Sequence, residues 1–461
     1  MSDIPFGFGK PNDPDDESGR DPDKPRGDKP ADPFGMFGDS QQMADMLRRF
    51  ADMMSWQGGP VNWDLAKDIA RQVAAEGGDP TVAEARRAAV AEALRLADLW
   101  LDDSTTFPSG ISVTEAWSRA EWVEHTLPVW SKLCDPLAER VVQSMGENMP
   151  QEMQAMAGPL LGMVKQMGGM MVGQQSGQAI GALAREVVGS TDVGLPVGPE
   201  GHGVLLPSGV DGFADGLEVP LDEVRLYLAL REAAHHRLFV HVPWLRQHLF
   251  RAVEDYARGI SFDMSRLEES IGRIDIANPE AIQELLSGGE ALFQPEDTPA
   301  QKAALGRLET ALALVEGWVS TVVDASAADR LPHAVALAEA VRRRRASGGP
   351  AERTFASLVG LELRPRRLRE AATVWASLTE ARGVAGRDAV WAHPDLLPSA
   401  EDLDDPEAFI QERGISDALD LDISQLTDGD SDGPDAAGGD GGPGEGPDGG
   451  DDPKGPAGGP A

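Results

Sequence analysis

The strongest constraint on the fold is an apolar repeat in the C-terminal half of the chain. Its members alternate in spacing between three and four residues: Leu305, Leu308, Leu312, Val315, Val319 and Val322. Residues at these spacings share one face of an α-helix, so the repeat predicts a long helix with a buried stripe. Asp297 or Thr298, followed by Pro299, is expected to begin it, because Asp and Thr cap helix N-termini and proline fits the first helical position.

Composition extends the helical prediction to most of the chain. Hydrophobic residues make up 41% of it but aromatic residues only 5%, and Ile and Thr are scarce beside Ala, Leu, Glu and Arg. The abundant types favour helices, whereas β-branched and aromatic residues favour strands. The sequence therefore predicts a mostly α, multi-helical fold with little or no sheet. A short strand or hairpin is plausible only at residues 205–224.

The two ends of the chain differ in composition from its middle. Residues 1–40 are rich in Asp, Pro and Gly, and residues 426–461 form an acidic tract rich in Gly and Pro. Such segments cannot bury enough apolar surface to fold, so both ends are predicted to be disordered. One helical domain is expected between them at 41–425, with an N-terminal helical part at 41–185 and a part carrying the candidate site at 186–425.

Charge and cysteine content exclude several classes of function. A formal net charge of −36 repels phosphates along a polymer or surface, which argues against nucleic acid or an anionic membrane as the main partner. The single cysteine, Cys134, allows neither an intrachain disulfide nor a cysteine-based zinc site, and a structural thiol is expected there. The N-terminus shows no secretory pattern, so a cytoplasmic protein is expected.

Glycines recur every four residues in one segment: Gly169, Gly173, Gly177 and Gly181. On a helix they form a stripe along which another backbone can approach closely. Each glycine costs up to about 1 kcal/mol of helix propensity, so a packing partner must offset that cost. Packing against another helix of the same chain is the favoured interpretation. Dimerisation in a membrane is the alternative, although residues 166–184 contain too many Gly and Gln for a convincing span.

Capping and proline signals predict further helix boundaries. Thr81 with Glu84 is expected to open a helix that ends near Leu101. Ser112 with Glu115 is expected to open a second, tryptophan-bearing helix. Other expected features are an end or kink of that second helix at Pro128, a helix start at Pro243, and helices at 332–345 and 364–381 separated by the loop RRRRASGGP.

The candidate site lies in residues 221–259, which hold four of the chain's eight histidines. An amphipathic helix is expected there, with Glu232 and His235 on one face and Arg231 one turn from His235. A carboxylate one turn from an imidazole is the core of the motif HExxH, in which two histidines bind zinc and the glutamate is the general base. Glu316, beside the apolar stripe, needs either an ion-pair partner or a bound cation.

Four segments carry a family resemblance: REAAHHRLFVHVPWL, LALVEGWVSTVVDAS, GQQSGQAIGALAREVVGSTDVGLPV and WAHPDLLPSAEDLDDP. Together they resemble an actinobacterial family of zincin-like metallopeptidases over most of residues 35–410. The resemblance implies a zincin-like domain, bound Zn²⁺ and zinc-dependent peptide hydrolysis. It assigns Glu232 as the general base, His235 as a zinc ligand and Glu316 as a further zinc ligand.

Two departures from the family pattern leave two functions open. Arg231 replaces the first zinc histidine, and Trp318 replaces a histidine that follows Glu-Gly. Arginine cannot ligate zinc because its guanidinium is protonated and has no lone pair, and His235 with Glu316 falls short of the usual three protein ligands. The chain is either a zinc metallopeptidase homologue or an inactive pseudoenzyme, a helical scaffold for a peptide or protein partner in which Arg231 pairs with a carboxylate such as Glu316. The other histidines of the segment are expected on the polar surface or capped in the core, unless one replaces the missing ligand: His236, His241 and His248.

Overall fold

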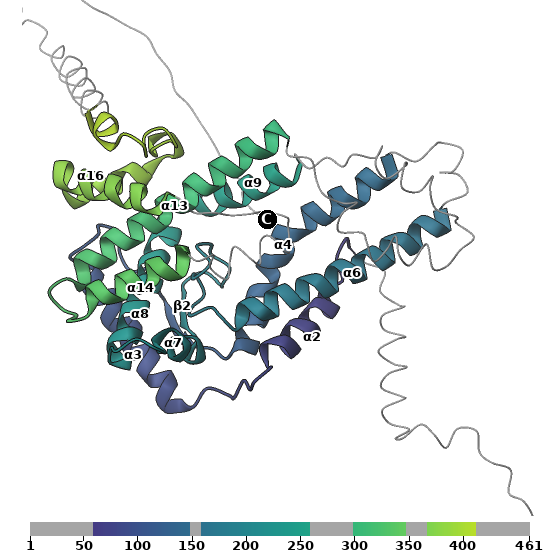
Figure 1. Ribbon diagram of the computed structural model, residues 1–461, viewed down its shortest axis with the longest axis horizontal. Helices are drawn as coiled ribbons and strands as arrows, with labels where there is room; N and C mark the ends of the chain where they lie inside the picture. The colour runs from purple at the N-terminus through teal and green to yellow at the C-terminus, as the bar shows by residue number, and fades with distance from the viewer. Residues whose placement is uncertain (1–58, 148–157, 259–297, 347–366, 412–461) are drawn as a thin grey trace, which may run out of the picture. The chain divides into compact units, whose positions relative to one another are not determined.

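Helices dominate the residues that the computed structural model describes, which are 59–147, 158–258, 298–346 and 367–411. All of them lie in one compact unit, Gln57–Ala461, and they include a single two-stranded sheet (Figure 1). The predicted mostly α fold is therefore confirmed. Both chain ends that were predicted to be disordered lie outside the described residues.

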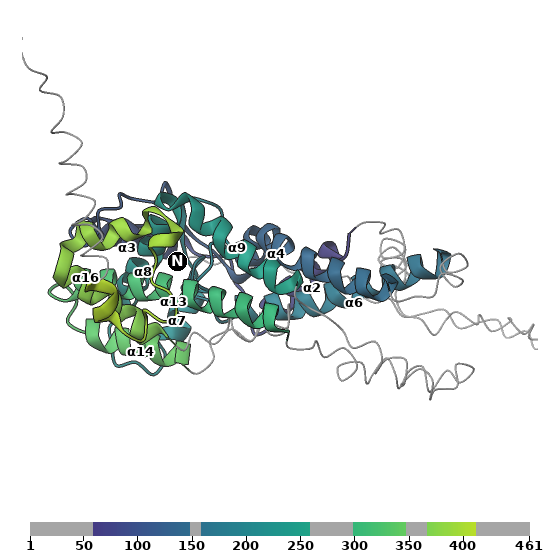
Figure 2. The same ribbon diagram turned by 90° about the horizontal axis from the view of Figure 1, so that it is seen from above.

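Helix α2, Trp63–Ala74, and helix α6, Gly158–Ala184, pack along the glycine stripe (Figures 1 and 2). A Cβ on any of three stripe glycines would lie 2.6 Å from a backbone oxygen of α2 or of its N-cap residue: Gly173, Gly177 and Gly181. Only glycine allows so close an approach of two helices. The prediction of packing within the chain is confirmed. Among the described helices, none has the length and apolar character that a bilayer crossing requires.

Helix α8, Leu221–His241, and helix α13, Pro299–Ala327, contact each other at the core of the unit. Helix α13 begins as predicted, with Thr298 as the N-cap in a capping box and proline in its first turn. Helix α8 is buried at every position from Tyr227 to Leu238. It is therefore a core helix surrounded on all sides, and the prediction of an amphipathic helix with one solvent face is wrong.

Several elements surround this pair. Helix α3, Glu84–Leu101, and helix α9, Pro243–Arg258, pack on α8 and α13 respectively, and helix α16, Leu368–Ala389, packs on α13. Proline 243 begins α9 as predicted. The predicted extent of α3 is also correct, but its cap is not, because the N-cap residue is Ala83 and no side chain caps the helix.

The sheet pairs two short parallel strands, β1 at Val113–Ala116 and β2 at His202–Leu205. The prediction that Ser112 and Glu115 open a helix is therefore wrong. Helix α4, Arg119–Glu147, starts later, where Ser118 and Glu121 make the reciprocal hydrogen bonds of a capping box. Both tetrapeptides fit the same capping pattern, and the β-branched pair Val-Thr in the first one favours a strand.

Three other boundary predictions differ from the structure. Pro128 stands inside α4 and does not end it. Within residues 205–224 only the last residue of β2, Leu205, is strand, and helix α7, Pro207–Ala214, follows. The arginine run expected in a loop belongs to helix α14, Ala334–Ala346. Four consecutive arginines are polar enough to suggest a loop, but each has a carboxylate partner on or beside the helix. Arg342 and Arg343 pair with Glu339 of the same helix, and Arg344 and Arg345 pair with Asp192 and Glu316.

Candidate functional site

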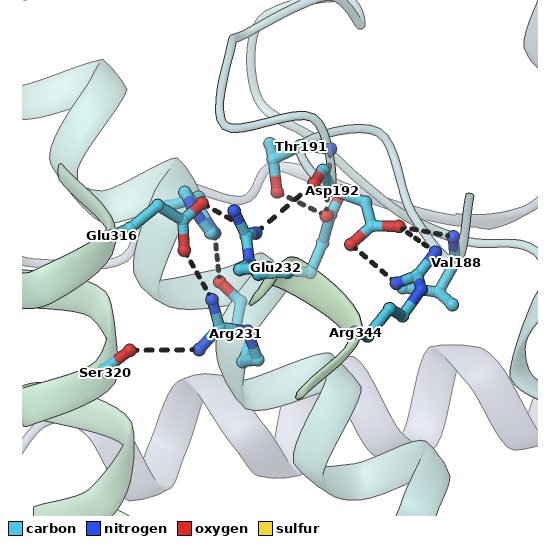
Figure 3. A network of polar contacts seen from close by, with 10 residues as sticks. Val188, Thr191, Asp192, Arg231, Glu232, Glu316, Ser320 and Arg344 are labelled. Atoms are coloured by element: carbon cyan, nitrogen blue, oxygen red, sulfur yellow. Dashed lines mark hydrogen bonds and ion pairs between the residues drawn. The ribbon is translucent and has the colours of Figure 1, made fainter. Parts of the chain in front are cut away.

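The candidate residues lie where α8 contacts α13 and the loop that precedes β2 (Figure 3). Arg231 is 6% exposed, Glu232 3%, His235 2% and Glu316 2%. Four ionisable side chains are thus almost completely removed from water. Burial of charge is unfavourable unless each group is paired and hydrogen-bonded, so their partners determine what the site can do.

Glu316 is the centre of a buried ion-pair cluster. Its Oε2 accepts a hydrogen bond of 2.6 Å from Nη2 of Arg231 (Figure 3), and its Oε1 lies 2.7 Å from Nη2 of Arg345 and 3.0 Å from Nε2 of His235. Burial raises the pKa of Glu316, but the attraction of Arg345, His235 and Arg231 outweighs it and holds the pKa well below its usual range. The predicted pairing of Arg231 with Glu316 is confirmed.

The ring of His235 is held from both sides. Its Nδ1 lies 2.8 Å from the backbone oxygen of Arg231, and its Nε2 faces Oε1 of Glu316. Both oxygens are acceptors, so both contacts are hydrogen bonds only when the ring carries a proton on each nitrogen. In that form the imidazole donates twice and has no lone pair for a metal.

Glu232 belongs to a second cluster, separate from the first. Its carboxylate accepts hydrogen bonds from backbone N–H groups at 3.0–3.2 Å and from two hydroxyls at 2.5 and 2.6 Å, and it lies 3.4 Å from an imidazole nitrogen. The donors are N–H and Oγ of Ser190, N–H and Oγ1 of Thr191, N–H of Val204, and Nε2 of His236. The contact of Thr191 is visible in Figure 3.

These donors determine the charge of Glu232. Burial raises the pKa of its carboxyl, but hydrogen bonds and the charge of His236, together with the hydroxyls of Ser190 and Thr191, lower the pKa to about 2. Glu232 and His235 were expected to share one face. The structure separates them, because Glu232 points to residues 190–191 while His235 points to Glu316.

Helix α14 ties the two clusters together. Arg344 makes two hydrogen bonds with the carboxylate of Asp192, at 3.1 and 2.9 Å, and Asp192 also accepts one from the backbone N–H of Val188 (Figure 3). The next residue, Arg345, pairs with Glu316 and donates to the backbone oxygen of Asp192. Sequence reasoning missed these contacts, although the run of four arginines was visible.

Little space is left between the two clusters. A cavity of about 20 Å³ is enclosed there by residues that include Arg231, Glu232, His235 and Arg345. That volume is on the order of one water molecule. A peptide substrate therefore has no room beside His235 and Glu316 in this arrangement.

The residues around Glu316 do not fit a zinc ion. His235 contacts Glu316 directly, and two guanidinium groups occupy the remaining carboxylate positions. Guanidinium offers no lone pair and its charge repels a cation. Across the described ranges, no group of three or more His, Cys, Asp or Glu side chains has a metal-binding arrangement.

The other singled-out side chains lie elsewhere. His241 contacts the backbone oxygen of Ser109, and the ring of His248 packs edge-on against Trp244. Neither takes part in the Glu316 cluster. Trp318, at the position of a family histidine, is fully buried and donates from Nε1 to Asp388 at 2.9 Å. Cys134 is buried, and burial raises its pKa to about 12, which agrees with a structural thiol.

Comparison with known proteins supports the resemblance seen in the sequence. The sequence model of a family described as "Zincin-like metallopeptidase" matches residues 61–410. The crystal structure of "a putative hydrolase with a novel fold" from Chloroflexus aurantiacus is similar, with 20% sequence identity and a TM-score of 0.56, over 77% of this chain and 99% of that one. At this identity the similarity shows a shared fold. The comparison with curated proteins gives no match.

Proposed function

The chain belongs to the zincin-like metallopeptidase family, and from this premise we propose that it is a pseudoenzyme in which buried arginines replace the zinc ion. Such a protein acts by binding a peptide or protein partner and does not hydrolyse peptides. The observation that carries the proposal is the occupation of Glu316 by Arg231, Arg345 and His235 at 2.6–3.0 Å.

The charge of the two arginines supports the proposal that they replace a zinc ion. A catalytic zinc ion brings two positive charges to its ligands, and the guanidinium groups of Arg231 and Arg345 bring the same charge to Glu316. Arg231 can therefore join α8 to α13, and Arg345 can join α14 to α13, through the same carboxylate that a metal would use. Because arginine is a donor and never a ligand, the contact keeps the scaffold and loses the Lewis acid.

The surroundings of Glu232 also support a non-catalytic role. A general base works best with a pKa near the operating pH and needs hydrogen-bond reach to the water that it activates. Glu232 has a pKa of about 2, and Ser190, Thr191 and Val204 occupy its oxygens. We infer that Glu232 fixes the 190–191 loop against α8, where it acts as a structural clamp.

A binding role has a surface available beside this clamp. A cavity of about 260 Å³ is lined by Ser190, Pro199, His236, Phe239 and Arg246, among others. Concave sites with apolar walls and a few polar groups are typical of ligand binding. We assign the partner segment to this cavity, next to the face of α8 where family members carry their catalytic residues.

Family membership favours a second candidate, which is zinc-dependent peptide hydrolysis with Glu232 as the general base. It requires Arg345 and Arg231 to leave Glu316, the ring of His235 to give up its contact with Glu316, and Glu232 to exchange its hydrogen bonds for water. The two candidates predict different metal contents.

The test is zinc analysis of the full chain, purified without chelators, together with a peptidase assay on a mixed peptide library with added zinc. We expect far less than one zinc per chain and no cleavage. One zinc per chain with cleavage that Glu232→Gln abolishes, in a variant that remains folded, would make the proposal wrong.

Two double variants test whether the guanidinium groups at Glu316 are what prevents zinc binding. Arg231→His with Arg345→Gln supplies the first histidine and removes the second guanidinium from Glu316, so zinc binding should rise. Arg231→His with Arg342→Gln is the matched control, because Arg342 lies on the same helix and pairs with the exposed Glu339. We expect the control to bind less zinc, since Arg345 still occupies Glu316.

A further inference from the structure

We propose that a cavity between α7, α14 and the start of α4 binds the phosphate group of a small phosphate ester. The cavity has a volume of about 480 Å³, within the range of small-molecule sites. Four arginines line it: Arg119, Arg185, Arg343 and Arg344. The site is distinct from the Glu316 cluster, and the inference does not depend on the pseudoenzyme proposal.

The charge of the lining is opposite to that of the chain. The chain carries a formal net charge of −36, yet four arginines face one cavity whose lining includes a single carboxylate, Glu186. Concentrated positive potential in a concave surface attracts a small anion. A polyanion such as nucleic acid would meet the acidic remainder of the chain, so a small ligand is favoured.

Two of these arginines have partners that a ligand can displace. Arg185 pairs with Glu76 and Arg343 with Glu339, and all four side chains are 40–78% exposed. Exposed ion pairs contribute little and exchange readily with other anions. Arg344 differs, because it is fixed by Asp192 and its guanidinium lies 5.9 Å from the centre of the Phe213 ring. It provides a wall of fixed position, although Asp192 balances its charge.

Buried polar atoms without hydrogen-bond partners are the second observation. Within the described residues, Nε of Arg119 and Oγ of Ser208 are both buried and have none, and both residues line the cavity. A buried polar group that is left without a hydrogen-bond partner destabilises the fold. Phosphate oxygens supply several strong acceptors, so a group bound where it reaches either atom would give that atom its missing partner.

The first turn of α7 contributes backbone groups to the same cavity. Ser208 and Gly209 belong to the first turn of this helix, where backbone N–H groups have no acceptor within the helix. A Cβ at Gly212 would meet no atom within 4 Å, so the wall beside the arginines is open. Arginine forks match phosphate geometry better than that of a spherical anion, and this selects a phosphate over chloride.

The test is isothermal titration calorimetry of the full chain at low salt. AMP and inorganic phosphate are the two ligands, and adenosine is the uncharged control. We expect binding of AMP or phosphate and no binding of adenosine. Arg119→Gln with Arg343→Gln should weaken that binding at least tenfold. Arg342→Gln, which removes a charge from α14 outside the cavity, should leave it unchanged.

Two outcomes overturn the inference: no binding of either AMP or phosphate at millimolar concentrations, or equal binding by the wild type and the Arg119/Arg343 double variant. Circular dichroism establishes that this double variant is folded, and Ser208→Ala, expected to weaken binding a few-fold, probes the same cavity without removing a charge. Zinc content and peptidase activity do not enter these readouts, so this inference and the pseudoenzyme proposal fail independently.

Discussion

Two helix pairs in this chain are held together by opposite means. Helices α2 and α6 meet along glycines, with backbone oxygens only 2.6 Å from where a Cβ would stand. Helices α8 and α13 meet through the charged side chains of Arg231, His235 and Glu316. The first contact uses shape alone, and the second uses buried charges that must balance one another.

Under the proposed pseudoenzyme function, the difference explains how the chain would lose a catalytic centre and keep its fold. A seam of glycines has no chemistry to change. In a seam of charges, a metal and its ligands can be exchanged for arginines as long as the buried carboxylate keeps its positive partners.

The largest expected effect comes from removing the charge at the centre of the second pair. Glu316→Gln leaves Arg231 and Arg345 buried without their carboxylate. Removing one partner of a buried ion pair costs about 3–5 kcal/mol, so the free energy of unfolding should fall by that amount. Urea unfolding followed by circular dichroism measures it.

Glu339→Gln is the matched control for this prediction. Glu339 also contacts two arginines, Arg342 and Arg343, but on the surface, where water replaces the lost contacts. Its effect should be close to zero. A similar loss of stability in both variants would show that burial is not what makes the Glu316 cluster costly to break.

A smaller effect is expected in the glycine seam. In Gly177→Ala the new methyl group would lie 2.6 Å from the backbone oxygen of Ala66 and 2.8 Å from Cβ of Ile69. Such overpacking costs about 1–3 kcal/mol. Gly168→Ala on the same helix meets nothing within 4 Å and should stabilise the protein slightly, since alanine is the better helix former. Thermal unfolding of the two variants compares them, and equal shifts would contradict the account.

The two seams also differ in how far the sequence predicts them. The glycine repeat predicts its own packing, because backbone approach depends only on the spacing of small residues along one helix. Glu316 was recognisable as a buried carboxylate, and Arg231 as its partner. Arg345 was not, because a run of arginines followed by Ser-Gly-Gly-Pro looks like a solvated loop in sequence.

The surroundings of Glu232 could not be predicted for a similar reason. Ser190 and Thr191 lie more than 40 residues away in the chain and reach Glu232 only because the loop before β2 folds over α8. The residues of strand β1 fit the pattern of a capping box and therefore predict a helix. Pairing with β2, which is distant in the sequence, makes them a strand. Local patterns predicted most helices, and long-range polar contacts determine the site.

The smallest expected effect is the loss of stability on acidification. It should affect the contacts of the charged Glu232 and leave the glycine contacts unchanged. Because the folded pKa of Glu232, about 2, lies below the unfolded value, its carboxylate stabilises the fold above the unfolded pKa. This contribution is lost as the pH falls toward 2. With an unfolded pKa of about 4.3, lowering the pH from 7 to 4 removes roughly 0.6 kcal/mol of it.

The stability difference between wild type and Glu232→Gln should therefore narrow by that amount between pH 7 and pH 4. The difference between wild type and Gly177→Ala should stay constant, because a methyl group does not titrate. Urea unfolding of the three proteins at both pH values makes the comparison. Parallel behaviour of the two variants would mean that the hydrogen bonds from Ser190 and Thr191 do not hold Glu232 as an anion, and a Glu232 with an ordinary pKa would again be available as a base.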